Sequence, residues 1–250
     1  MIFRNVFFWL CFVLLASTPI AKAGTITVGS GSLLDLGGAT LSNASHSLVN
    51  DGTLRLGTSF GTWQDVATNS AADTQGEDGT LELVGDWSNG GAFNPGSSLV
   101  RFIDGGTGNS QILGATTFYD LSAVTATGES LVFESGREQG VLNSLEFVGA
   151  DSNLLRIFST SPGVEGLISL VPSAAQTVDF VDVSDNHGVL QVIAPGSPAA
   201  FNSIQGPNVR GWFSTPLLFP IPTASTLGLI LMALLLLAMV YTQKNKGIIR

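Results

Sequence analysis

The middle of the chain, from Gly24 to about Trp212, is a continuous series of short apolar runs separated by turn residues. Runs such as TLRLG, TLELV and SLVRFI are rich in Leu, Val, Ile, Phe and Thr, and Gly, Asn, Asp and Ser lie between them. This pattern is typical of an all-β protein. The one segment with a helix-like composition, WQDVATNSAADT, is too polar to bury a helix face.

Several runs alternate between apolar and polar residues. In TLRLG, Leu54 and Leu56 flank Arg55, and TLELV shows the same pattern around Glu82. Because successive strand residues point to opposite faces, each of these strands is expected to have one buried face and one face in solvent.

The element DGTL occurs at Asp51 and again at Asp78. The interval between them matches one coil of a solenoid, in which coils of roughly 20 to 27 residues stack and bury aliphatic ladders. We therefore expect residues 24–213 to form a right-handed parallel β-helix of at most about nine coils. A β-sandwich built from antiparallel hairpins is the alternative.

Residues 1–23 have the organisation of a secretory signal peptide. Arg4 supplies the positive charge, residues 6–16 form a short apolar core, and Ala21 and Ala23 are small residues at the positions that signal peptidase recognises. We expect cleavage before Gly24, and an uncleaved N-terminal anchor is the alternative.

The C-terminal end has the organisation of a membrane anchor. Residues 214–224 form a Pro-containing linker, residues 225–243 are almost wholly apolar and long enough for one transmembrane helix, and residues 244–250 form a basic tail. The positive-inside rule places the basic residues on the cytoplasmic side, where they stop transfer. These membrane-stop residues are Lys244, Lys246 and Arg250.

Charge and cysteine content exclude several classes of function. Cys11 is the only cysteine and lies in the expected signal peptide, so the exported part can have neither disulfides nor thiol chemistry. Five arginines minus nineteen acids gives −14 for this part, which contains no lysine before Lys244. Such an acidic surface repels nucleic acid.

Two patterns could indicate catalysis or metal binding. Ser59 lies in GTSFG, which matches the nucleophile motif of hydrolases, but that motif needs a following helix and a histidine, and His187 is the only one downstream. Asp179, Asp182 and Asp185 could serve as acid and base or bind structural calcium, whereas solvated turns are the simpler interpretation. His46 and His187 lack partners at the spacing of zinc ligands.

Aromatic residues offer two interpretations. They could form sugar-stacking platforms on an acidic surface, or they could fill the core, which is the more common role. The residues concerned are Trp63, Trp87, Trp212 and Tyr119. Carbohydrate-active enzymes on β-helices usually have a longer helix and use Lys or Arg at their sites, whereas this ectodomain has no lysine and only scattered arginines. We therefore expect a protein that is not an enzyme and needs no cofactor.

Two segments resemble parts of large repetitive bacterial surface proteins of the adhesin and haemagglutinin type. Residues 85–121, which begin GDWSNGGAFNPG, are similar to a turn and two ladder strands of those proteins. VDFVDVSDNHG and FNSIQGPNVRGW resemble their closing coil. The resemblance implies a β-helical ectodomain and identifies no ligand.

The tail resembles the IPTL-CTERM class of sorting signals, which are related to the PEP-CTERM tails processed by exosortase-type enzymes in Gram-negative bacteria. The resemblance rests on Ile221, Pro222 and Thr223, followed by Ser225 and Gly228, an apolar segment and a basic end. The leucine, acid and tryptophan of the usual pattern are missing. It implies recognition at Ile221–Thr223 and removal of the tail outside the inner membrane.

Together these features predict an exported, non-catalytic protein of the cell surface or extracellular matrix, adhesive or structural in role. Its expected partners are the membrane, signal peptidase, an exosortase-like enzyme and extracellular polysaccharide, with no nucleic acid. Two alternatives stay open, a small carbohydrate-active β-helix enzyme and a permanent single-span inner-membrane protein with a periplasmic domain.

Overall fold

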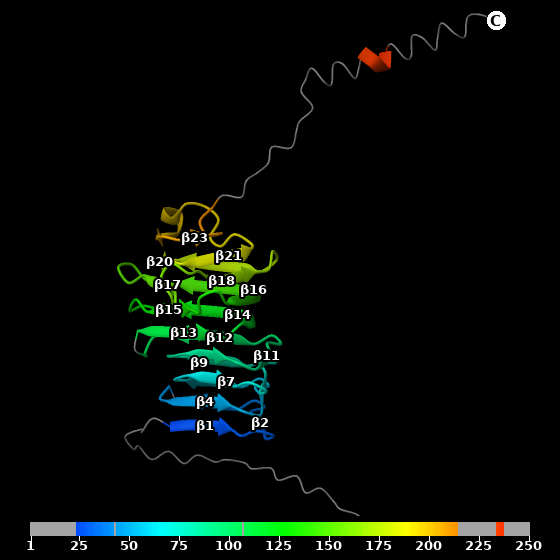
Figure 1. The fold of residues 1–250 in the computed structure, drawn as a ribbon, viewed down its shortest axis with the longest axis vertical. Helices are drawn as coiled ribbons and strands as arrows, with labels where there is room; N and C mark the ends of the chain where they lie inside the picture. The colour runs from blue at the N-terminus through cyan, green and yellow to red at the C-terminus, as the bar shows by residue number, and fades with distance from the viewer. Residues whose placement is uncertain (1–23, 43, 107, 215–233, 238–250) are drawn as a thin grey trace, which may run out of the picture. The chain divides into compact units, whose positions relative to one another are not determined.

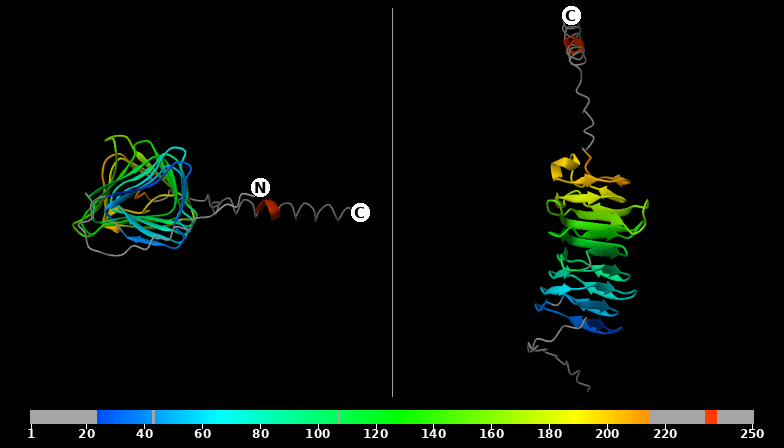
Figure 2. Two further views of the ribbon diagram at one scale, coloured as in Figure 1. Left: turned by 90° about the horizontal axis from the view of Figure 1, so that it is seen from below. Right: turned by 90° about the vertical axis from the view of Figure 1, so that its left-hand side faces the viewer.

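The computed structural model describes residues 24–42, 44–106, 108–214 and 234–237. Residues 24–214 form a column of stacked coils whose strands run perpendicular to the column (Figure 1). Three sheets surround a common core, as the end-on view of Figure 2 shows. Every ladder pair between these strands is parallel, for example β1 with β4 and β12 with β14. The expected parallel β-solenoid is therefore confirmed, and the β-sandwich alternative is wrong.

Each sheet receives strands from successive coils. The first sheet has nine, about one per coil, in the order β1 Gly24–Val28, β4 His46–Asn50, β7 Val66–Thr68, β10 Trp87–Asn89, β13 Asn109–Leu113, β15 Ser130–Phe133, β17 Leu155–Ser159, β20 Val181–Val183 and β22 Ile204–Gln205. The second sheet is present only in the first four coils and contains β2 Leu33–Asp35, β5 Thr53–Arg55, β8 Asp73–Gln75 and β11 Ala92–Asn94.

The third sheet follows the whole column. It contains β3 Thr40–Ser42, β6 Phe60–Trp63, β9 Thr80–Leu83, β12 Leu99–Ile103, β14 Thr116–Val124, β16 Glu138–Val148, β18 Gly166–Leu170, β21 Asn186–Leu190 and β23 Val209–Arg210. An additional strand, β19 Ala175–Asp179, pairs with the second half of β16. After β11 the coils contain no strand of the second sheet. In these coils the third-sheet strands β14 and β16 are longer than the other strands.

Coil length differs from the expectation based on the DGTL repeat. Thr62 in β6 pairs with Glu82 in β9, so neighbouring coils here are offset by 20 residues. Thr53, from the first DGTL element, pairs with Asp73, whereas Thr80, from the second, pairs with Phe60. The two elements therefore lie in different sheets and do not stack. Their spacing is not the coil length, because the same turn sequence occurs at two different corners of the column.

The core runs along the axis of the column and consists of aliphatic and aromatic ladders. Leu54 and Leu56 have no exposed surface, and Leu81 and Leu83 are at most 1% exposed, which confirms the alternation expected from the sequence. Buried polar residues join the core where they can bond to one another. Asn50, for example, donates from Nδ2 to Thr74 Oγ1 at 2.9 Å.

A cap closes the end of the column nearer the C-terminus. The 3₁₀ helix η1 Pro198–Phe201 and the last residues of the coil cover the core there. Trp212 stacks on Phe147 with ring centroids 6.5 Å apart and donates from Nε1 to Asn186 Oδ1 at 3.0 Å. Phe213 packs beside Trp212 and is 6% exposed.

The chain divides into two compact units, residues 1–215 and 216–250. In the second unit Leu234–Leu237 are helical. Within the described residues no helix is both long enough and apolar enough to cross a membrane. The expected signal peptide with Ala21 and Ala23, most of the linker and transmembrane segment, and the basic tail lie outside the described residues. The sorting-motif residues also lie outside them, namely Ile221, Pro222, Thr223, Ser225 and Gly228.

Candidate functional site

The structure does not bring Ser59 and His187 together. Ser59 follows the turn at Gly57 and is 2% exposed, with no hydrogen-bond partner for its hydroxyl, and it is followed by strand β6. His187 lies in β21, six strands further along the third sheet. At about 4.8 Å per strand, the two residues are about 29 Å apart along the column. The geometry of a nucleophile and its base is not present at this pair.

Two of the three aspartates of VDFVDVSDNH bond to different asparagines. A left-handed residue, Phe180 with φ 52°, bends the chain between Asp179 and Asp182. Asp179 accepts a hydrogen bond from Asn202 at 2.9 Å, and Asp185 accepts one from Asn208 at 3.0 Å. Across residues 24–42, 44–106, 108–214 and 234–237, no three His, Cys, Asp or Glu residues are grouped as metal ligands. These contacts favour solvated, polar environments at Asp179 and Asp185, whereas Asp182 lies within strand β20.

The tryptophans belong to the core. Trp63, Trp87 and Trp212 are at most 2% exposed, so a sugar ring cannot stack on them. Trp87 lies 5.0 Å from the Phe93 ring centroid. The interpretation of these three residues as packing residues is confirmed, and the sugar-platform interpretation is wrong for them.

An ion pair near the capped end was not expected from the sequence. Arg210 in β23 bonds in bidentate fashion to Glu165, which precedes β18, and His187 Nδ1 lies 3.8 Å from Glu165 Oε2. The hydrogen bond from Arg210 is the main cause that lowers the pKa of Glu165. The partners are 45 residues apart in the sequence, and only the stacking of coils brings them together.

The most regular polar surface is a column of side chains on the outer face of the third sheet. Strand register places them one per coil, from β6 to β19, and we call this column the Glu82 ladder. Its members are Thr62, Glu82, Arg101, Ser122, Glu146 and Thr177. Six residues at about 4.8 Å per strand give a column about 24 Å long.

Hydrogen bonds connect neighbouring members of the ladder. Thr62 Oγ1 donates to Glu82 at 3.4 Å, Arg101 Nη1 pairs with the other oxygen of Glu82 at 3.4 Å, and Ser122 Oγ donates to Glu146 at 2.7 Å. The Arg101 side chain is 38% exposed and the Glu82 side chain 16%. Arg101 Nε is buried and has no partner. Thr62 is 9% exposed and Ser122 only 2%, so the ladder presents mainly Glu82, Arg101, Glu146 and Thr177 to solvent.

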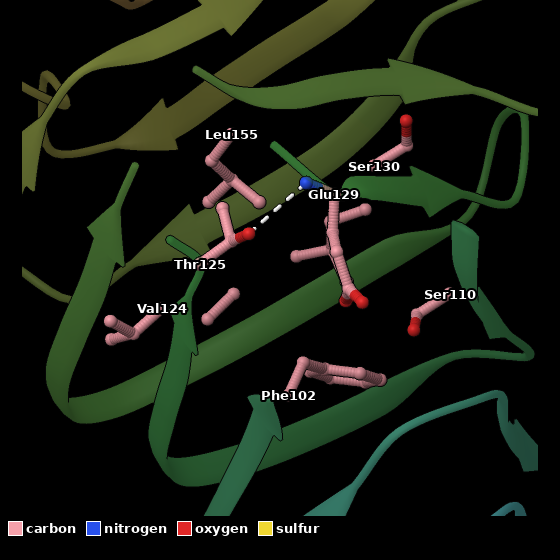
Figure 3. Close-up of a pocket in the computed structure, with 9 residues that line it drawn as sticks. Phe102, Ser110, Val124, Thr125, Glu129, Ser130 and Leu155 are labelled. Carbon is pink, nitrogen blue, oxygen red and sulfur yellow. Dashed lines mark hydrogen bonds between the residues drawn. The ribbon is translucent and has the colours of Figure 1, made fainter. Parts of the chain in front are cut away.

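A small cavity lies inside the column beside β12, β13 and β15 (Figure 3). Its volume is about 10 Å³, enough for one water molecule. The Glu129 carboxylate and the unpartnered hydroxyl of Ser110 face it, among apolar side chains such as Phe102 and Leu155. Thr125 Oγ1 fixes the adjoining turn by accepting three backbone N–H groups, including that of Glu129 at 3.1 Å.

Burial and hydrogen bonding shift the pKa values of two carboxyl groups in this region in opposite directions. Desolvation is the main cause that raises the pKa of Glu129, with a smaller contribution from nearby Asp104. Desolvation would also raise the pKa of Asp104, but hydrogen bonds from Thr125, Ala126 and Thr127 outweigh it and lower that pKa. Because this cavity holds at most one water molecule, we assign it a structural role.

No protein family, curated protein or solved structure was found to match this chain.

Proposed function

We propose that the protein is an exported, non-catalytic component of the cell surface or extracellular matrix, and that its solenoid binds a linear polysaccharide along the Glu82 ladder. The ladder is the observation that carries this proposal. Its accessible groups, Glu82, Arg101, Glu146 and Thr177, lie in register along the outer face of one sheet, so they suit a polymer whose hydroxyl groups recur along a line. A globular ligand would contact only part of such a line.

The charge pattern supports a neutral or weakly charged polymer. Within the ladder, Arg101 stands between Glu82 and Glu146, so the local charge is far smaller than that of the whole acidic ectodomain. Carboxylates and guanidinium groups form charge-assisted hydrogen bonds with hydroxyls, which are stronger than neutral ones. Binding therefore depends on Arg101 and Glu82 more than on the hydroxyl residues.

The enzyme alternative is less well supported by this geometry. Glu82 and Glu146 are three strands apart, which separates them by about 14 Å along the column. A pair of catalytic carboxylates on a glycosidase lies about 5 to 9.5 Å apart. The two ladder glutamates are too far apart to act on one glycosidic bond.

Export and sorting rest on the sequence. Residues 1–23 act as a signal peptide that is removed before Gly24, and the tail is recognised at Ile221–Thr223 and cut outside the inner membrane by an exosortase-like enzyme. A permanent single-span anchor formed by residues 225–243 is the alternative. We also propose that the coils of the solenoid are right-handed.

Binding can be tested by affinity electrophoresis of the purified protein in gels containing the extracellular polysaccharide of its own cells. Removing one charge-assisted contact, as in Arg101→Gln, should weaken binding about tenfold. Arg55→Gln is the matched control, because Arg55 is an exposed arginine on the second sheet, away from the ladder. Equal mobility of the two variants, or no retardation of the native protein, would exclude the ladder as the binding face.

A further inference from the structure

The two ends of the solenoid differ. At the C-terminal end, Ile193, Trp212 and Phe213 are at most 6% exposed beneath the cap described above. At the other end, β1, β2 and β3 form the first coil, and no described residue packs against their outer edges (Figure 1). The backbone N–H and C=O groups on these edges have no strand of the described chain beside them.

The exposed first coil carries core residues. Ile26 stands in the same ladder as Leu48, and Leu34 in the same ladder as Leu54. Leu48 and Leu54 have no exposed surface, whereas Ile26 is 38% exposed and Leu34 is only partly buried. The side chains at this end are exposed because no further described coil covers them.

Charged residues and proline, which usually protect an open sheet edge, are scarce in the first coil. Natural proteins block such edges with charged residues, proline or bulges. Residues 24–45 contain one charged residue, Asp35, and no proline. In an ectodomain with five arginines against nineteen acids, this nearly uncharged end is the face on which two copies repel one another least.

We propose that the first coil binds the first coil of a second copy, which gives a head-to-head dimer. A two-fold axis perpendicular to the column, through the centre of β1, brings β1 against its own copy in antiparallel orientation. The same axis brings β2 against β3 of the second copy, and both strands have three residues. This inference rests on the proposed removal of residues 1–23.

The residues that meet under this symmetry are complementary. With Ile26 on the axis, Ile26 faces its own copy, and Thr25 faces Thr27 on the outer side. The centre of β2, Leu34, faces Leu41, the centre of β3, and both leucines pack against the core. Inward-facing residues therefore meet inward-facing residues, and the core continues across the interface.

Head-to-tail assembly does not offer the same fit. The strands at the capped end, β22 and β23, have two residues each, and the cap covers the core beside them. An interface in which one patch binds itself closes as a dimer and leaves no open end. About 20 residues on each side is also the usual size of a stable interface.

Disulfide formation across the two-fold axis tests the proposal in the full-length chain. Residues directly opposite in an antiparallel pair have Cα atoms about 4.5 to 5.5 Å apart, which is within the range that a disulfide spans. In a Cys11→Ser background, Ile26→Cys should give mainly a covalent product of twice the mass after mild oxidation. Ile204→Cys, at an exposed isoleucine of the capped end, is the matched control and should stay monomeric.

Sedimentation gives a second, independent measurement. Ile26→Lys places two ammonium groups on the axis and should convert the dimer into a monomer with an unchanged circular dichroism spectrum, whereas Ile204→Lys should remain dimeric. A native protein that sediments as a monomer overturns the proposal, whatever its first residue. So does a crosslinked Ile26→Cys product whose mass shows another polypeptide.

N-terminal sequencing of the same samples separates this proposal from the proposed function. A dimer that begins at Gly24 supports both. A dimer that retains residues 1–23 contradicts the proposed processing and, with it, the free first coil on which this interface rests. A monomer that begins at Gly24 supports processing and contradicts the interface.

Discussion

Truncation of one ladder leucine measures how much the stacking of coils contributes to stability. Leu54 has no exposed surface and stands between Leu34 of the first coil and Thr74 of the third. Leu54→Ala removes buried methyl groups and leaves a cavity between rigid strands that cannot close around it. The expected loss in the free energy of unfolding is about 3 to 4 kcal/mol.

Leu34→Ala is the matched control, because it makes the same change in the same ladder at the open end. The Leu34 side chain is only partly buried, so in the isolated monomer its truncation should cost about half as much. Where the first coils of two copies pair, Leu34 becomes buried and its cost should approach that of Leu54. The cost of Leu34→Ala should therefore rise with protein concentration.

Urea denaturation followed by far-ultraviolet circular dichroism gives both values, at two protein concentrations a hundredfold apart. A loss below about 1 kcal/mol for Leu54→Ala would contradict the tightly packed core. An equal loss for both variants at the lower concentration would contradict the open first coil.

Three further predictions concern single residues. Glu129→Gln should raise the urea midpoint at pH 7, because burial raises the pKa of Glu129 and its ionised carboxylate destabilises the folded state. This gain should vanish when the pH falls below 4.5, the ordinary pKa of a glutamate side chain. Ser59→Ala should leave stability unchanged or slightly higher, because it removes a buried hydroxyl without a partner, and polysaccharide binding should not change in affinity electrophoresis. Gly114→Ala should lower the free energy of unfolding by more than about 2 kcal/mol in urea denaturation, because its Cβ would lie 1.9 Å from the Asn89 carbonyl oxygen. Gly136 also has a positive φ but faces open space, so Gly136→Ala should lower it by only about 1 kcal/mol.

The sequence was sufficient to predict the strands and their buried faces. Alternation around Arg55 and Glu82 predicted which side chains face the core, because a period of two has only one arrangement that buries the leucines. Parallel stacking was expected from the recurring DGTL element, but the two elements lie in different sheets and do not stack. The expectation was therefore correct although its reason was not, and the glycine-rich turns suit a β-sandwich equally well.

Coil length could not be predicted, because the DGTL turn does not specify which corner it occupies. Asp51 precedes a strand of the second sheet and Asp78 a strand of the third. The end of the second sheet after β11 could not be predicted from the sequence either, because β14 and β16 are composed of the same kinds of residue as the shorter strands.

The candidate site depends on register that the sequence does not show. Glu82 and Arg101 become neighbours although they are 19 residues apart, whereas the neighbours Ser122 and Glu146 are 24 residues apart. A variable coil length prevents any fixed period from revealing the Glu82 ladder. The Arg210–Glu165 pair, 45 residues apart, was unpredictable for the same reason.

Mass spectrometry of the mature protein from its native cells tests the central claim of export and surface sorting most directly. The account predicts a chain that begins at Gly24, ends near Pro222 and is recovered outside the inner membrane, with Pro222→Ala causing the tail to be retained. An intact chain that reaches Arg250, remains in the inner membrane and is unaffected by Pro222→Ala would contradict it.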